Sequence, residues 1–214
     1  MTYRLILGNK NYSSWSMRAW LMMRLIGIDF EETIVPIYSP GARDMVADLG
    51  GETGLVPVLL DGDLAIWDTL AIFEYLHERH PSVWPTRADH RARARSYAAE
   101  VHSGFADLRD AMPCNTRARG RRAVVSPAIE RDIRRTIRIW EGSGNFGSPW
   151  LFGAFGGADI MFAPIATRFQ TYGIALSGRA ACYGDSLLNH PLVAEWLAAG
   201  QAEPGVIPGS EIGC

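Results

Sequence analysis

The sequence predicts an α/β region followed by an all-α region. Three observations predict this fold class: strand and helix patterns alternate over residues 1–80, two prolines interrupt them at Pro81 and Pro85, and only helical spacing follows. We therefore expect an α/β domain at residues 1–80, a linker at 81–87 and an all-helical domain at 88–214.

The α/β region opens with a strand, a helix and a second strand. Residues 3–7 are an apolar strand-like run, and residues 33–37 are rich in β-branched side chains. Between them, residues 12–26 predict a largely buried helix with serines at its start and Gly27 just past its end. Because a helix joins the two strands, we expect them to be parallel with a right-handed crossover.

Shorter elements complete the first region. Residues 40–49 predict a weak helix that ends at Gly50-Gly51. Asp61-Gly62 separates the apolar runs 57–60 and 63–67, which predicts an antiparallel hairpin. Asp68 is a favourable N-cap for a further helix that runs to about His80.

The second region shows helical spacing in four places. Residues 87–112 predict one long helix that ends before Pro113. Residues 128–140 repeat isoleucines at intervals of four, and further helices are expected at 159–172 and 192–199. No strand is needed after residue 85, so this half is expected to be all helix.

Composition excludes several classes of protein. The chain has 214 residues, of which 48% are hydrophobic and 21% charged, with a net charge of −2, so disorder is not expected. No apolar run reaches the length of a membrane span, and no secretory signal opens the chain, which predicts a cytoplasmic protein without a membrane partner.

The cations are concentrated in the second half. Residues 1–80 carry a net charge of −5 and residues 81–214 a net charge of +3, with 13 arginines between Arg87 and Arg138. A basic run can bind nucleic acid, but acidic residues are interspersed and no nucleic-acid signature accompanies it. We interpret the run as a solvated helical surface and expect no nucleic-acid partner.

Cysteine and histidine spacing predicts neither disulfides nor a metal. Cys114, Cys182 and Cys214 are odd in number and far apart, which is not the pattern of a disulfide framework or a cysteine zinc site. The five histidines contain no metal-binding spacing, so no metal is expected.

The turn after the first strand carries the strongest chemical signal. Residues 11–18 (NYSSWSMR) open a helix, whose unpaired N–H groups and dipole favour an anion. Ser13 and Ser16 have the spacing of the C-x-x-C pair found at this turn in thioredoxin-like redox proteins. A serine hydroxyl there can donate a hydrogen bond to the thiolate of a ligand. Simple N-capping is the alternative interpretation.

Two further features suit a thiol peptide. Pro57 begins a strand, and a cis bond after Val56 would leave the Val56 backbone free to pair with an extended peptide. At the next helix N-terminus, Thr69 could hold a carboxylate and Asp68 an ammonium group. The implied ligand is a small, acidic thiol peptide.

With these residues in place, the chain resembles the cytosolic glutathione transferases over essentially its whole length. The segment Ser13-Ser14-Trp15-Ser16-Met17-Arg18 is similar to the S-S-C-S-x-R motif of the zeta class, which includes maleylacetoacetate isomerases. The resemblance implies a thioredoxin-like first domain, glutathione as co-substrate, Ser13 as catalytic residue and Ser14 as its neighbour. Trp15 stands where the zeta motif has cysteine.

The resemblance extends to the rest of the binding site. It implies a cis-proline site at Val56-Pro57 and a γ-glutamyl clamp at Asp68-Thr69, with Lys10 and Arg43 as candidates for the glycine carboxylate of glutathione. Residues 153–164 resemble the family's capping motif, with Gly156 as N-cap, Asp159 at the third helical position, and Phe155 and Ile160 as a hydrophobic staple.

The function implied is a glutathione transferase acting on an electrophilic small molecule. Basic Arg109 would suit an acidic electrophile, although it could instead pair with a neighbouring aspartate. The alternatives are a zeta-type glutathione-dependent isomerase and a non-catalytic binding module with this fold. A homodimer is expected from the family. Besides Arg109, the candidate residues for the electrophile side, each with packing as its alternative, are Trp15, Tyr97, Phe105 and Met112.

Overall fold

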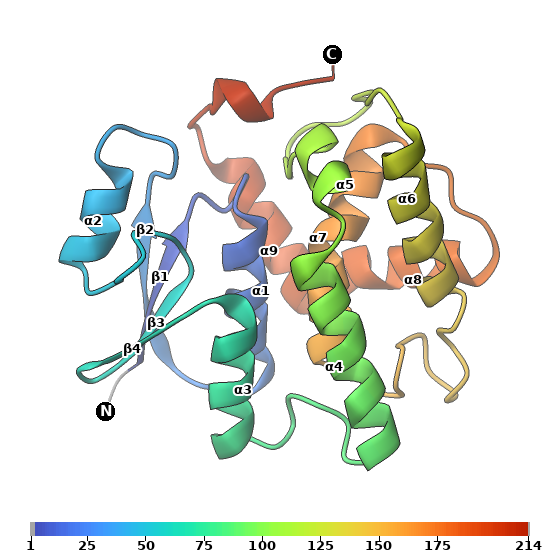
Figure 1. Ribbon diagram of the computed structural model, residues 1–214, viewed down its shortest axis with the longest axis horizontal. Coiled ribbons are helices and arrows are strands. Elements are labelled where there is room, and N and C mark those ends of the chain that lie inside the picture. Colours follow the sequence, from blue (N-terminus) through green and yellow to red (C-terminus); the bar gives the residue numbers. More distant parts are fainter. Residues whose placement is uncertain (1–2, 214) are drawn as a thin grey trace.

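The computed structural model describes residues 3–213 and begins with a four-stranded mixed sheet (Figure 1). As the sequence predicts, β1 and β2 are parallel and β3 and β4 are antiparallel. The strand order is β2-β1-β3-β4, and β1 pairs with β3 in an antiparallel direction. The elements are β1 (Tyr3–Gly8), α1 (Ser14–Leu25), β2 (Phe30–Val35), α2 (Ala42–Asp48), β3 (Val58–Asp61), β4 (Leu64–Trp67) and α3 (Thr69–Arg79).

Alternation along β1 divides the core into two layers. Leu5 and Leu7 pack into the large cluster with α1, α3 and the later helices, whereas Ile6 packs into a smaller cluster that contains Val46 of α2. Helix α2 therefore covers one face of the sheet, while α1 and α3 cover the other (Figure 1). The second face joins the sheet to the rest of the molecule.

The remainder is helical, as predicted: within the described residues, no strand follows Trp67. Helix α7 lies at the centre of this part, buried along nearly its whole length, and contacts α1, α4 and α8. The elements are α4 (Ala88–Ser103), α5 (Ala106–Ala111), α6 (Pro127–Trp140), α7 (Gly157–Tyr172), α8 (Gly178–Asn189), α9 (Pro191–Ala202) and the short 3-10 turn η1 (Pro208–Ser210).

The prediction of one continuous helix over residues 87–112 is wrong. The chain breaks between α4 and α5, where Gly104 is extended and Phe105 has a left-handed φ of 55°. A side chain at Gly104 would come within 2.7 Å of the Glu100 carbonyl. The Arg109 guanidinium donates to the carbonyls of Val101 and Gly104. These two carbonyls at the end of α4 thereby receive a hydrogen-bond partner that the helix does not supply.

Two other elements differ from expectation. The second strand lies at Phe30–Val35 rather than 33–37, because Glu31 and Glu32 pair with β1 in spite of their charge. Helix α8 was not predicted; its packing depends on Gly184, which brings the helix close to the ring of Trp140. Neither the pairing of Glu31 and Glu32 with β1 nor the packing of Gly184 against Trp140 produces a hydrophobic periodicity in the sequence.

The start of α7 confirms the capping motif. Asp159 accepts hydrogen bonds from the N–H of Gly156, the N–H of Leu151 and the hydroxyl of Tyr183. Burial raises the pKa of Asp159 to about 6, against the lowering effect of these hydrogen bonds. Phe155 stacks on His190, with ring centroids 3.7 Å apart.

None of the helices described between residues 3 and 213 has the length and apolar character needed to cross a membrane.

Candidate active site

A cleft of about 1050 Å³ runs between the α/β part and the helical part of the molecule. The start of α1, the β2–α2 loop and the approach to β3 supply one side. The end of α5, the loop after it and helix α7 supply the other, and the end of the chain closes it. Its lining comprises residues 12–15, 37–39, 41–44, 46, 54–56, 109–110, 113–114, 168 and 207–210.

Ser13 is the N-cap of α1 and lies in the wall of this cleft. Its Oγ accepts from the N–H of Ser16 at 3.3 Å and donates to Ser16 Oγ at 2.8 Å. Ser16 Oγ accepts in turn from the N–H of Gly8 at the end of β1, at 2.9 Å. The hydroxyl of Ser13 is thereby fixed between the last residue of the strand and the first turn of the helix.

Ser14 faces a buried cation. Its Oγ accepts a hydrogen bond of 3.2 Å from Arg168 of α7, whose Nε donates to the carbonyl of Met112 at 2.8 Å. Arg168 is only 4% exposed, yet it lines the cleft. Because the Ser14 oxygen accepts from Arg168, its own proton remains available to donate to another group.

Three arginines lie close to one another at the cleft: Arg109 and Arg168 line it, together with Asp110, and Arg18 is buried outside its lining. Arg18 and Arg168 are buried and Arg109 is half-buried, and none of the three forms an ion pair within the described chain. Burial lowers the pKa of each, and Arg168 lowers the pKa of the other two further by charge repulsion. An anion would relieve this repulsion.

Trp15 lies among these cations. The guanidinium carbon of Arg18 lies 4.5 Å, and that of Arg109 5.5 Å, from the ring of Trp15. The His102 ring of α4 meets Trp15 edge-on, with centroids 5.4 Å apart. Trp15 therefore packs between the two parts of the molecule and also borders the cleft.

The approach to β3 forms the opposite wall. The Val56–Pro57 bond is cis, as the resemblance implies, and Val56 lines the cleft. Arg43, near the start of α2, also lines it. These two predicted residues and Ser13 therefore share one cavity.

Asp68 and Thr69 lie at the start of α3, outside the residues that line the cleft. Asp68 accepts from the N–H of Leu70 at 2.8 Å and lies 2.5 Å from Nε2 of His102. Thr69 is buried, and its Oγ1 has no hydrogen-bond partner. A buried hydroxyl without a partner is uncommon in folded proteins.

Besides Pro57, Asp68 and Thr69, four predicted residues do not line the cleft. Lys10 pairs with Glu32 at 2.6 Å, so its ammonium group already has a carboxylate partner. Tyr97 lines a separate hollow, of about 350 Å³, near the start of α4. Phe105 and Met112 are buried core residues. Tyr97, Phe105 and Met112 were expected on one face of a continuous helix. The break at Gly104 instead leaves Tyr97 in α4 and places Phe105 and Met112 at the two ends of α5.

Several residues of the cleft were not predicted. Arg168 could have been found, because it is the one cation in the apolar helix α7 and a buried arginine is unusual. Tyr12, Cys114 and residues 207–210 gave no such signal, since they reach the cleft through long-range contacts. Burial raises the pKa of the Cys114 thiol, which opposes a reactive thiolate there.

The described residues contain no cluster of three or more histidine, cysteine or acidic side chains that could hold a metal. Cys114 and Cys182 are free thiols, and Cys214 lies outside the described residues.

Comparisons with known proteins agree with this architecture. Residues 12–79 match the family model "Glutathione S-transferase, N-terminal domain". The chain is 33% identical over 98 residues to a probable maleylacetoacetate isomerase of Caenorhabditis elegans, which is 45% of each chain. It is 32% identical over 94 residues to glutathione S-transferase Z2 of Arabidopsis thaliana, 42% of each. These matches span less than half the length of either relative.

Solved structures extend the similarity over nearly the whole chain. A glutathione transferase homologue from Burkholderia GL BGR1, solved with bound glutathione, superposes with a TM-score of 0.72 at 22% identity. The match covers 95% of this chain and 100% of that one. Residues 12–79 therefore belong to the glutathione S-transferase N-terminal domain family, within a chain that has the glutathione S-transferase fold.

Proposed function

We propose that this protein is a glutathione transferase, which binds glutathione in the cleft and activates its thiol for attack on an electrophilic small molecule. The observation that carries this proposal is the start of α1, where Ser13 caps the helix and lies in the cleft wall beside Ser14. A hydroxyl and a helix N-terminus together favour an anion, and the thiolate of glutathione supplies one.

The residues around the cleft fit the parts of glutathione. The main chain of Val56 would pair with the cysteinyl unit, and Arg43 would meet the glycine carboxylate. Thr69 would receive the γ-glutamyl carboxylate, which its unpartnered Oγ1 suits, and Asp68 the ammonium group. Lys10 is not part of this assignment because Glu32 neutralises it.

The energy required is within reach of these groups. A free thiol has a pKa near ~8.5, and lowering it by ~2 units requires about 2.7 kcal/mol of preferential stabilisation of the thiolate. A helix N-terminus supplies roughly 0.3–1 kcal/mol and a hydrogen bond to a charged group about 1.5–3 kcal/mol. A serine hydroxyl at the start of α1 is therefore sufficient in magnitude.

The reaction follows from the thiolate. Its sulfur would form a bond to the electrophilic carbon of the second substrate, and a halide or similar leaving group would depart with the bonding electrons. Trp15 and Arg109 border the place where that substrate would lie. The charge of Arg109 and Arg168 suits an acidic electrophile.

A second candidate is a glutathione-dependent cis–trans isomerase. The name of the Caenorhabditis elegans relative favours it. The same thiolate would add to a carbon–carbon double bond, rotation would follow in the adduct, and expulsion of the thiolate would restore glutathione. Trp15 in place of the cysteine of the zeta motif favours conjugation over this route.

We further propose that residues 1–80 bind the thiol and residues 88–214 shape the electrophile side, with 81–87 as the link. We also propose that the protein works in the cytoplasm as a homodimer. Glutathione is present mainly as the thiol in a reducing compartment, which supports that location. Light scattering on the purified protein at several concentrations would test the dimer.

One experiment separates the candidate functions. Calorimetry first measures glutathione binding, and its absence would favour a non-catalytic module. A halonitroarene and a maleyl-type substrate are then offered separately with glutathione while free thiol is monitored. Loss of thiol with the halonitroarene supports the transferase, whereas product formation without loss of thiol supports the isomerase.

A further inference from the structure

Arg168 of helix α7 is a buried cation in the wall of the cleft. Its side chain is 4% exposed, and within the described chain it forms no ion pair. A buried charge destabilises a protein unless hydrogen bonds or an opposite charge compensate for the lost water. The hydrogen bonds that Arg168 makes therefore indicate its role.

Three hydrogen bonds fix the direction of the Arg168 guanidinium. Nε donates to the carbonyl of Met112 at 2.8 Å, and Nη1 donates to the carbonyl of Pro164 at 3.3 Å. Nη2 donates to Ser14 Oγ at 3.2 Å. Because two of these bonds end on main-chain carbonyls of the helical part, the third is aimed at the first residue of α1, in the α/β part.

The contact with Arg168 also orients the hydroxyl of Ser14. A serine hydroxyl has one proton to donate and an oxygen that accepts. In the part of the chain that the structure describes, Ser14 Oγ accepts from Arg168 and donates to no other residue. Its proton is therefore left for a group in the cleft, which Ser14 lines. A hydrogen bond from a cation polarises the O–H bond and makes the hydroxyl a stronger donor.

Other charged and titratable groups lie near Arg168 without contacting the Ser14 hydroxyl. Arg18 donates to the main-chain carbonyl of Ser14, at 3.4 Å, and not to its side chain. Asp110 lines the cleft but forms no ion pair among the described residues. The remaining groups that interact electrostatically with Arg168 are Arg109, Cys114, Tyr38 and Tyr172.

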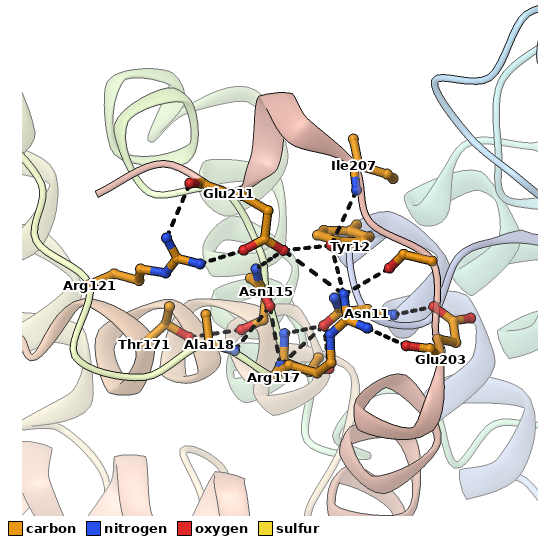
Figure 2. Close-up of polar contacts among 12 residues, drawn as sticks. Asn11, Tyr12, Asn115, Arg117, Ala118, Arg121, Thr171, Glu203, Ile207 and Glu211 are labelled. Carbon is orange, nitrogen blue, oxygen red and sulfur yellow. Dashed lines mark hydrogen bonds and ion pairs between the residues drawn. The ribbon is translucent and has the colours of Figure 1, made fainter. Parts of the chain in front are cut away.

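The turn that carries the serines is fixed independently of Arg168. The carboxylate of Glu203 accepts from the N–H of Asn11 at 2.9 Å, and the hydroxyl of Tyr12 donates to Glu211 at 2.6 Å (Figure 2). These contacts lie on the opposite side of the serines in sequence from helix α1. Replacing Arg168 should therefore remove a partner of the serine hydroxyl while the path of the turn is retained.

We propose that Arg168 is a positioning residue for thiol activation, which holds the Ser14 hydroxyl with its proton towards the glutathione sulfur. Ser14 is then a second donor to the thiolate, beside Ser13, and Arg168 acts through Ser14. This inference rests on the proposed function, because it concerns how the same site activates glutathione.

The ultraviolet absorbance of bound glutathione, followed against pH, measures the pKa of its thiol without turnover. In Arg168→Met we expect this pKa to rise by about 0.5–1 unit, because Ser14 loses the cation that orients and polarises it. Ser14→Ala should give a rise of the same size. Adding Arg168→Met to Ser14→Ala should raise the pKa by less than about 0.3 unit more, because the two residues act as one unit.

The rate with a halonitroarene supplies a second readout. If the bound thiol of wild type has a pKa of about 6.5, this rise lowers the thiolate fraction at pH 6 about three- to eightfold in Arg168→Met, and kcat should fall equally. At pH 8.5 the thiol is mostly ionised in both proteins, so kcat should agree within about twofold. A residue that only supports the fold would not produce a loss that disappears at high pH.

Three further variants control for loss of structure. Arg168→Gln is neutral but keeps an amide donor for a carbonyl, and it should raise the pKa as Arg168→Met does. It replaces Arg168→Met in every comparison if the latter does not fold. Arg168→Lys keeps a cation and should reverse more than half of the rise. Thr167→Val removes a buried hydroxyl that donates to the Ala163 carbonyl at 3.1 Å, so it should lower the Tm without moving the pKa.

The outcomes separate this inference from the proposed function. If the wild-type protein does not bind glutathione, the proposed function fails. If it binds glutathione and neutral variants at Arg168 leave the thiol pKa unchanged, the inference is overturned and the proposed function stands. Shifts that add fully in the double variant would show that Arg168 does not act through Ser14. A loss of kcat equal at pH 6 and pH 8.5 would assign Arg168 to supporting the Met112 carbonyl, which also overturns the inference.

Discussion

Nε2 of His102 lies 2.5 Å from a carboxylate oxygen of Asp68, which joins helix α4 to the N-cap of α3. The other carboxylate oxygen of Asp68 accepts from the N–H of Leu70 at 2.8 Å. Asp68 therefore caps a helix with one oxygen and meets the helical part of the molecule with the other. Its proposed role with glutathione adds a third function, and these functions can be separated by mutation.

Asp68→Asn retains the cap and removes the charge, since asparagine and aspartate are equivalent N-cap residues. We expect the KM for glutathione to rise by about tenfold, the effect of losing one charged contact to the ammonium group, with little change in kcat. Thermal unfolding should change little. Asp68→Ala should give the same rise in KM and also lower the free energy of unfolding by about 1 kcal/mol.

The two Asp68 variants control for one another. A KM that rises only in Asp68→Ala would show that glutathione depends on the cap and not on the charge. Asp89→Asn, which removes an exposed carboxylate paired with Arg87 at 2.6 Å on α4, should leave the KM at the wild-type value.

Ser13→Ala should lower kcat/KM by about a hundredfold. Removing one preorganised hydrogen-bond donor to an anion in an active site has an effect of this order. The ultraviolet absorbance of the bound thiolate, followed against pH, should show the pKa of glutathione rising by about 1–2 units, because a charge-assisted hydrogen bond is lost. The variant should also lose about 1 kcal/mol of stability as its N-cap.

Ser14→Ala is the matched comparison. Ser14 keeps its own proton available while accepting from Arg168 at 3.2 Å, whereas Ser13 donates to Ser16. The two hydroxyls of Ser13 and Ser16 can exchange roles by rotation, so Ser16 can donate to Ser13 and free the Ser13 proton for the thiolate. Because Ser13 is also the N-cap of α1, we expect a smaller loss of activity in Ser14→Ala than in Ser13→Ala. The reverse order, with the thiolate pKa moved only by Ser14→Ala, would transfer the donor role from Ser13 to Ser14.

Local chemistry explains which parts of the site could be predicted. Ser13 and Asp68 are N-caps in the structure as in the sequence interpretation, because capping depends on residues within one helical turn. Asp159 is likewise a capping residue three positions into α7. In each of these cases the partner is a backbone N–H near in sequence.

Long-range contacts explain what could not be predicted. The break at Gly104 is accompanied by a hydrogen bond of 3.1 Å from Arg109 to the Val101 carbonyl, eight residues earlier, and hydrophobic periodicity does not describe such a contact. The position of residues 203–213, which follow α9, depends in part on Glu211 accepting a hydrogen bond from Tyr12, which lies 199 residues earlier. Such pairings are set by tertiary packing, so the residues that close the cleft emerge only from the structure.

Arg109→Gln should discriminate between charged and neutral electrophiles. With 4-chloro-3,5-dinitrobenzoate, kcat/KM should fall by about ten- to hundredfold, because a hydrogen bond to a charged group contributes roughly 1.5–3 kcal/mol. With the methyl ester of the same compound, the change should be less than about threefold. The pair of substrates differs only in the carboxylate, so the ratio isolates its contact with Arg109.

Arg24→Gln is the control for overall charge, since Arg24 is exposed and pairs with Glu195 on a different surface. The free energy of unfolding should be measured as well, because Arg109 also pairs with the carbonyls at the end of α4. Equal losses with the acid and the ester would show that Arg109 shapes the site without contacting the substrate's charge.

The buried carboxyl of Asp159 should make stability depend on pH in an unusual direction. Its pKa is raised from 3.8 to about 6, mainly by burial, so between these values the folded protein binds a proton that the unfolded chain has released. This contribution is complete below about pH 4 and is lost as the pH rises through about 6. Its size is on the order of 3 kcal/mol.

Urea unfolding of wild type and Asp159→Asn between pH 4 and 7.5 measures this contribution. The variant should be less stable at every pH, because its amide group faces the N–H donors of Leu151 and Gly156 with only one acceptor oxygen. The difference between wild type and variant should be largest near pH 4 and shrink towards pH 6.5. Asp185→Asn, at an exposed position on α8, should show the same free energy of unfolding as wild type at every pH.

The opposite trend would contradict this prediction. If the difference between wild type and Asp159→Asn grows as the pH rises, Asp159 is stabilised as a carboxylate. The hydrogen bonds from Tyr183, Leu151 and Gly156 would then outweigh the effect of burial.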